Sequence, residues 1–138
     1  MQKATARWSG HKVKFAIHAN SGHEALIDEP ALFGDDEGMR PTEMLLGALG
    51  GCTGVNAVLL LKKFKQPFKS LDVEVEGDQA KDWPHAFTEI RINFKIGWDG
   101  KHDKELVENA LEMAVNKYCP VDATLSHGTK IKFQRSDA

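Results

Sequence analysis

The sequence predicts an α+β fold, and three observations carry that prediction. Segments 71–79 and 88–96 alternate strictly between apolar and polar residues, which is typical of half-exposed antiparallel strands. A long apolar stretch between Pro41 and Pro67 has the composition of a buried helix. A further segment, 103–118, repeats its apolar residues at helical spacing. Antiparallel strands combined with segregated helices indicate the α+β class, here as one domain over residues 1–138.

The first forty residues are expected to form a small antiparallel sheet. Residues 3–19 have the alternation of a hairpin around a Ser-Gly turn at 9–10. A second Ser-Gly turn precedes a short strand at 23–27. Residues 28–40 combine acids with proline and glycine, which predicts a loop.

The central helix is predicted to begin near Pro41, because proline is tolerated in a first helical turn. Glu43 follows, where a carboxylate suits the positive end of the helix dipole. Residues 44–61 are apolar almost without break, and Pro67 marks the stop. A helix that is apolar on nearly every face must be buried on nearly every side. In a domain this small, that pattern indicates a central helix covered by a partner subunit.

The C-terminal third is predicted to hold two helices and a strand. Asp103 is the candidate N-cap of the helix over 103–118. After Cys119 a short helical turn is expected to run to Ser126, and a last strand is expected at 129–133.

Composition excludes several classes of function. The chain has 138 residues, 28 % of them charged, and a formal net charge of -2, so neither nucleic acid nor an anionic membrane is an expected partner. The N-terminal residues lack the features of a signal peptide, which favours a cytoplasmic location. The apolar run 55–61, which includes Asn56, is far shorter than a membrane span.

The two cysteines are the residues most informative about chemistry. A secreted disulfide framework usually holds more, and neither the cysteines nor the six histidines have the spacing of a metal site. No metal site is therefore expected. Composition leaves open whether the cysteines are ordinary buried residues or a redox pair.

Cys52 lies within the apolar helix among three glycines, each of which costs a helix about 1 kcal/mol relative to alanine. Close helix packing and substrate access to the sulfur both explain such glycines. Helical geometry places an apolar set on the Cys52 face: Leu45, Ala48, Leu49, Val55 and Leu59, with Asn56. Because such surroundings raise a thiol pKa, a nucleophilic Cys52 needs a cation from elsewhere, and Arg40 and Arg7 are the candidates.

Cys119 precedes Pro120 and is predicted to cap the short helix that follows. A helix N-terminus favours a thiolate, as a resolving cysteine requires, although a small apolar cap residue explains the position equally well.

Four segments together resemble one known family. They are R-P-T-E-M-L-L-G-A-L-G-G-C-T-G at 40–54, S-G-H at 21–23, L-K-K-F at 61–64 and K-Y-C-P-V at 117–121. These motifs resemble the OsmC/Ohr superfamily, in particular its general OsmC-like branch. The resemblance implies an OsmC-like fold, an intertwined homodimer in which central cysteine-bearing helices pack against antiparallel sheets.

The resemblance also implies a peroxidase reaction within the oxidative stress response. Cys52 would attack an organic hydroperoxide, or hydrogen peroxide, to give a sulfenic acid, and Cys119 would condense with it to a disulfide. An external dithiol of the lipoyl or thioredoxin type would then reduce the disulfide. The reaction needs no metal, haem or flavin.

One position departs from the family pattern. The well-studied peroxidases of the family carry a glutamate ten residues before the first cysteine, where it orients an activating arginine. Thr42 occupies that position here, and Glu43 lies nine residues before Cys52, about 180° away on a regular helix. Arg40 and Glu43 are the candidates for the activating pair, with Glu43 either a first-turn acid or a contributor to the partner subunit's site.

Two further functions compete with the peroxidase. One is a non-catalytic dimeric protein that binds a small hydrophobic ligand, which Thr42 and the apolar Cys52 face favour. The other is a thiol redox sensor that becomes oxidised without turnover. Peroxide-dependent thiol loss excludes the binding protein, and turnover with a dithiol excludes the sensor.

Overall fold

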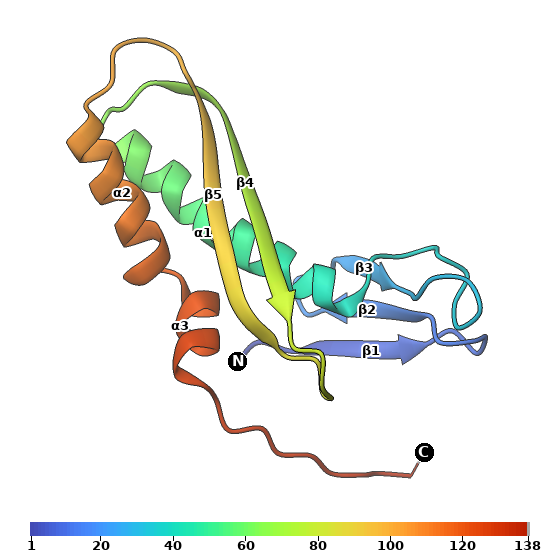
Figure 1. Ribbon diagram of the computed structural model, residues 1–138. Helices are drawn as coiled ribbons and strands as arrows, with labels where there is room; N and C mark the ends of the chain where they lie inside the picture. The colour runs from blue at the N-terminus through green and yellow to red at the C-terminus, as the bar shows by residue number, and fades with distance from the viewer. Residues whose placement is uncertain (138) are drawn as a thin grey trace. The chain divides into compact units, whose positions relative to one another are not determined.

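The computed structural model confirms the α+β class and describes residues 1–137. The elements follow in the order β1 (Ala4–Trp8), β2 (Phe15–Ala19), β3 (Glu24–Ile27), α1 (Pro41–Lys63), β4 (Phe68–Gln79), β5 (Phe87–Trp98), α2 (Lys104–Asn116) and α3 (Pro120–His127) (Figure 1). They gather in two compact units, Met1–Leu46 and the residues from Gly47 onward, and α1 contributes to both. The expectation of a single domain stays a prediction.

The first unit contains an antiparallel sheet in the order β1-β2-β3, as predicted. Its two turns contain Gly10 at φ 87° and Gly22 at φ 89°, in the left-handed region that glycine adopts without strain.

The loop that follows β3 is organised around the buried side chain of Asp28. This carboxylate accepts the backbone N–H groups of Glu29, Asp35 and Glu37 at 2.8, 3.1 and 3.2 Å. Burial alone would raise the pKa of the Asp28 carboxyl, but the three backbone donors together lower it below its ordinary value. Three backbone N–H groups of this loop are thereby hydrogen-bonded, although the loop is not part of a β-sheet.

The second unit contains the main apolar core. β4 and β5 pair along their whole length, with Val73 opposite Phe94 and Val75 opposite Ile92. The apolar residues of both strands share one face, and the opposite face is charged and exposed. The core cluster comes from α1 and α2: Ala57, Leu60, Leu61, Val107, Ala110 and Ala114.

Helix α1 ends before the predicted proline. The N–H of Lys65 bonds the carbonyl of Lys62, and the N–H of Gln66 bonds the carbonyl of Leu61, at 3.0 and 2.9 Å. Lys65 lies at φ 57°, so this is a Schellman motif with lysine in the left-handed position. The helix therefore stops at Lys63 because its final carbonyls are already satisfied.

A single chain covers α1 only in part, and the expectation that a partner subunit covers the rest stays a prediction. Val55 is 61 % exposed and Leu59 is 62 % exposed, although six other residues of α1 are buried. Among the described residues 1–137, α1 is the helix long and apolar enough to cross a bilayer by length and composition alone. The core helix of a water-soluble protein has the same length and composition, so the cytoplasmic location stays a prediction.

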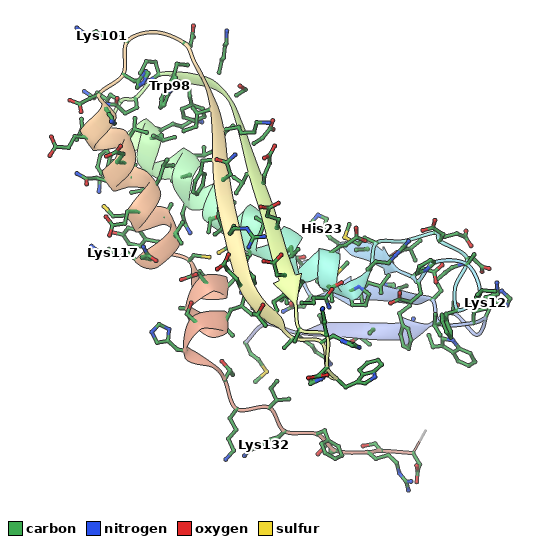
Figure 2. The ribbon with its side chains drawn as sticks, in the orientation of Figure 1. Lys12, His23, Trp98, Lys101, Lys117 and Lys132 are labelled. Atoms are coloured by element: carbon green, nitrogen blue, oxygen red, sulfur yellow. The ribbon has the colours of Figure 1, made fainter. Side chains whose placement is uncertain are left out.

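The predicted last strand at 129–133 is wrong. Residues after α3 form a coil that leads away from the helix in Figure 1, and Figure 2 shows Lys132 projecting from it. Ile131 and Phe133 are 91 % and 99 % exposed. A strand needs a neighbour to bond its N–H and C=O groups, and within residues 1–137 this segment has none.

Candidate thiol site

Cys52 lies half-buried in the middle of α1, and its glycine neighbours have two different roles. A Cβ on Gly50 would lie 3.0 Å from Val75 Cγ2, and a Cβ on Gly54 would lie 3.3 Å from Val73 Cγ2. These two glycines therefore let α1 approach β4 closely. A Cβ on Gly51 would meet nothing within 4 Å, so the helix surface at Gly51 itself is open. Close packing therefore explains Gly50 and Gly54, and substrate access to the sulfur stays a prediction.

Cys119 is the N-cap of α3, as predicted. Its Sγ accepts the backbone N–H of Asp122 at 3.3 Å, and Pro120 occupies the first turn. The side chain is only 4 % exposed, and both cysteines are free thiols.

The Cys52 thiol lies near enough to Cys119 to affect the titration of its thiol. Burial, followed by the hydrogen bond with Cys52, raises the pKa of the Cys119 thiol. The backbone N–H groups of Asp122 and Val121 act in the opposite direction but do not reverse the shift. The donors at the helix N-terminus thus favour the thiolate, as expected, but desolvation outweighs them.

Asn56 connects the two cysteine-bearing segments. Its side-chain N–H group donates to the carbonyl of Cys52 at 3.1 Å and to the carbonyl of Tyr118 at 3.2 Å. Helical spacing predicts Asn56 on the Cys52 face but not its bond to Tyr118, because no local pattern connects residues 62 positions apart.

The apolar surroundings predicted for Cys52 are partly exposed. Ala48, Val55 and Leu59 face outward from the second unit, whereas Leu49 is buried. A cavity of about 310 Å³ adjoins α3, and Leu49, Ile92, Leu125 and Asp122 are among the residues that line it. Since the N–H of Asp122 also bonds Cys119 Sγ, this partly apolar cavity reaches to within one helical turn of that sulfur.

Arg40 and Glu43 form local contacts in the first unit. The Arg40 guanidinium bonds Asp36 at 2.8 Å and the carbonyl of Gly38 at 3.0 Å, and the Asp36 hydrogen bond raises the arginine pKa. The Glu43 carboxylate accepts the backbone N–H of Arg40 at 2.8 Å, which is one half of a capping box. Glu43 is thus a first-turn acid of α1. A role for either residue at the sulfur stays a prediction, as it does for Arg7 of β1.

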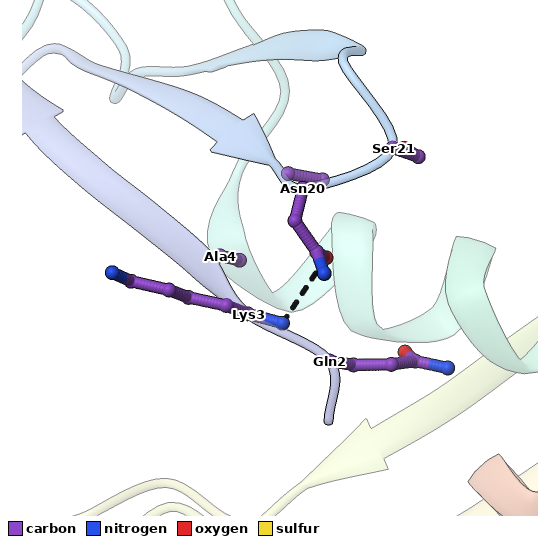
Figure 3. A pocket seen from close by; sticks show the side chains of 6 residues that line it. Gln2, Lys3, Ala4, Asn20 and Ser21 are labelled. Carbon is purple, nitrogen blue, oxygen red and sulfur yellow. Dashed lines mark hydrogen bonds between the residues drawn. The ribbon is translucent and has the colours of Figure 1, made fainter.

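Other polar features of the first unit serve its structure. Carboxylate oxygens of Asp28, Asp35 and Glu37 lie within 4.8 Å of one another, but Lys12 and Lys14 bond this cluster at 2.7 and 2.6 Å. A hollow of about 640 Å³ adjoins the start of β1 and the end of β2. Figure 3 shows the hydrogen bond between the Lys3 backbone N–H and the Asn20 side chain at its edge, 3.2 Å long.

A family model described as "OsmC-like protein" matches residues 34–134, a span that includes both cysteines and Asn56. The chain belongs to the OsmC-like family. It is 28 % identical over 130 residues to Protein YhfA of Escherichia coli strain K12, a match that covers 94 % of this chain and 92 % of YhfA.

Solved structures show the same OsmC-like fold. A hypothetical protein from Aquifex aeolicus VF5 superimposes with a TM-score of 0.77 at 26 % identity, covering 96 % of this chain and 92 % of that chain. The organic hydroperoxide resistance protein OhrB of Bacillus subtilis has a TM-score of 0.57 at 20 % identity, with 90 % of each chain covered. The fold is therefore shared with a protein named for hydroperoxide resistance.

Proposed function

We propose that this protein is a thiol-dependent peroxidase that reduces organic hydroperoxides through Cys52 and Cys119. The observation that carries the proposal is the pair of free thiols, one in α1 and one capping α3, near enough for Cys52 to raise the pKa of Cys119. The fold shared with OhrB adds support.

Cys52 is the attacking residue in this proposal. Cys52 is half-buried, whereas Cys119 is buried and its raised pKa keeps it protonated at neutral pH. The Cys52 thiolate attacks the terminal peroxide oxygen, the O–O bond breaks, and the alkoxide leaves to take a proton as the alcohol. The sulfur is oxidised to a sulfenic acid and the peroxide is reduced.

Cys119 resolves the sulfenic acid. Its sulfur bonds to Cys52 Sγ, the S–O bond breaks, and the hydroxyl leaves with the Cys119 proton as water. An external dithiol of the lipoyl or thioredoxin type reduces the disulfide by exchange and becomes a disulfide itself. The cycle uses no metal, haem or flavin. The cavity beside α3 has room for the apolar part of an organic hydroperoxide.

Arg40 and Glu43 enter the proposal as candidates for activating Cys52. The Cys52 thiolate needs a cation, and the guanidinium of Arg40 is permanently charged. To act on Cys52, Arg40 would exchange its ion pair with Asp36 for one with the thiolate. Arg40→Lys and Glu43→Gln test this assignment through the rate of Cys52 oxidation.

The second part of the proposal is a homodimer that closes on the outward face of α1. Val55 and Leu59 leave an apolar strip beside Cys52, and Ile131 and Phe133 leave a second apolar segment of the same chain uncovered. A second copy would cover both kinds of surface, since a symmetric interface uses the same patch on each protomer.

The deciding experiment counts free thiols on the reduced protein before and after one equivalent of cumene hydroperoxide. We expect loss of both thiols, reversal by a dithiol, and no loss in Cys52→Ser. Cys119→Ser should retain a sulfenic acid that dimedone traps. Survival of both thiols would refute the peroxidase and favour the ligand-binding protein, and oxidation without dithiol-supported turnover would favour the redox sensor.

A further inference from the structure

The side-chain amide of Asn56 bridges the backbone beside one cysteine to the backbone beside the other. The carbonyl of Cys52 lies one helical turn before Asn56, so that bond is local to α1. The carbonyl of Tyr118 belongs to the peptide unit that contains the Cys119 nitrogen. One side chain therefore restrains the Cys119 backbone relative to the turn of α1 that holds Cys52.

This restraint affects disulfide formation, which depends strictly on geometry. A disulfide forms only when the two Cα atoms lie within about 7 Å and the sulfurs adopt a narrow range of torsion angles. Holding two reacting groups in place raises their effective concentration by orders of magnitude. Asparagine is a poor helix former, so its place within α1 gains a reason from the bond to Tyr118.

We propose that Asn56 is a positioning residue for disulfide formation between Cys52 and Cys119. The inference rests on the proposed thiol chemistry and extends it to a residue that touches neither sulfur. Asn56 does not take part in the attack on the peroxide. It acts when Cys119 Sγ bonds to Cys52 Sγ and water leaves, and again in the thiol–disulfide equilibrium with the external dithiol.

Two variants separate the bond to Tyr118 from the bond within α1. Asn56→Thr keeps a hydroxyl that can bond the carbonyl one turn earlier, as Thr53 does with Leu49 at 3.0 Å, but it is too short to reach Tyr118. Asn56→Leu removes both hydrogen bonds and keeps a side chain of similar size. The matched control is Asn93→Thr, because Asn93 lies on the exposed charged face of β5.

The first measurement is the reduction potential of the Cys52–Cys119 pair in dithiothreitol redox buffers, which requires no peroxide. We expect Asn56→Thr and Asn56→Leu each to weaken the disulfide about tenfold, a rise in potential of about 30 mV. Asn93→Thr should match the wild type. A wild-type potential in both Asn56 variants would overturn the inference, as would a wild type that forms no disulfide at any potential.

The second measurement separates this inference from the peroxidase proposal. After one equivalent of cumene hydroperoxide, both Asn56 variants should consume peroxide at the wild-type rate but form the disulfide about tenfold more slowly, with more dimedone adduct on Cys52. An effect in Asn56→Leu but not in Asn56→Thr would assign the role to the helix bond and refute positioning through Tyr118. If the wild-type thiols are not oxidised by peroxide, the peroxidase proposal fails. The reduction potentials in redox buffers still decide the role of Asn56.

Discussion

The backbone N–H of Asp122 donates to Cys119 Sγ at 3.3 Å, so the sulfur itself caps α3. A buried thiol that caps a helix is stabilised in place by the fold, and the same burial raises its pKa. The two cysteines of this chain therefore differ in accessibility, with Cys52 half-buried and Cys119 almost fully buried.

This difference predicts selective alkylation. Iodoacetamide at pH 7.5 should modify Cys52 at least about tenfold faster than Cys119, because alkylation needs an exposed thiolate. Peptide mapping by mass spectrometry gives both rates in one reaction. Equal rates would contradict the assignment of Cys52 as the attacking residue.

The raised pKa of Cys119 also predicts how stability depends on pH. The folded state holds the Cys119 proton more tightly than the unfolded state does. The contribution of this proton to the free energy of unfolding is therefore fully present below the unfolded thiol pKa, near 8.5. It is lost as the pH rises through the folded pKa. Urea denaturation of the reduced protein between pH 7 and 10 should show this loss, and Cys119→Ser should show a smaller one.

Gly50 and Gly47 make a matched pair on α1. Alanine at Gly50 would place its Cβ 3.0 Å from Val75 Cγ2, whereas alanine at Gly47 would meet nothing within 4 Å. We expect Gly47→Ala to stabilise the fold by up to about 1 kcal/mol through helix propensity. Gly50→Ala should be less stable than Gly47→Ala by roughly 1–3 kcal/mol because of overpacking. Thermal unfolding of the two variants checks the order, and the reverse order would exclude close packing of α1 on β4.

Asp28 is predicted to hold its loop together only when ionised. Its pKa is lowered in the folded state, so its contribution is present above the unfolded carboxyl pKa, near 3.9, and is lost as the pH falls through the folded value. Asp28→Asn should speed hydrogen exchange at the amides of Asp35 and Glu37 at neutral pH. Asp72→Asn on the exposed face of β4 is the control, and unchanged exchange in Asp28→Asn would contradict this role.

The proposed dimer predicts that a charge on the outward face of α1 disrupts association. Leu59→Glu should give a monomer in sedimentation experiments where the wild type gives a dimer, since a carboxylate would be buried without a partner. Glu108→Gln, on the exposed part of α2, should leave the wild-type mass unchanged. A monomeric wild type would remove the dimer from the proposal.

The elements of this fold could be predicted from sequence wherever the signal is local. Alternation placed β4 and β5, Asp103 and Cys119 were identified as caps, and the apolar run from Pro41 marked α1. The strand expected at 129–133 failed because a strand requires a neighbour, which local alternation does not supply. The predicted end of α1 at Pro67 is a few residues late, because Lys65 adopts a left-handed conformation that glycine usually occupies.

The sequence by itself determined the α+β class, the resemblance to the OsmC-like family and the two cysteines as the centre of interest, since periodicity, caps and motifs are properties of neighbouring residues. Only the tertiary structure decided that Cys119 is buried with a raised pKa, that Gly50 and Gly54 serve packing while Gly51 leaves space, and that Asn56 bonds Tyr118. These features arise from groups far apart in the chain. Desolvation and hydrogen bonding depend on which atoms surround a group, and folding alone brings those atoms together.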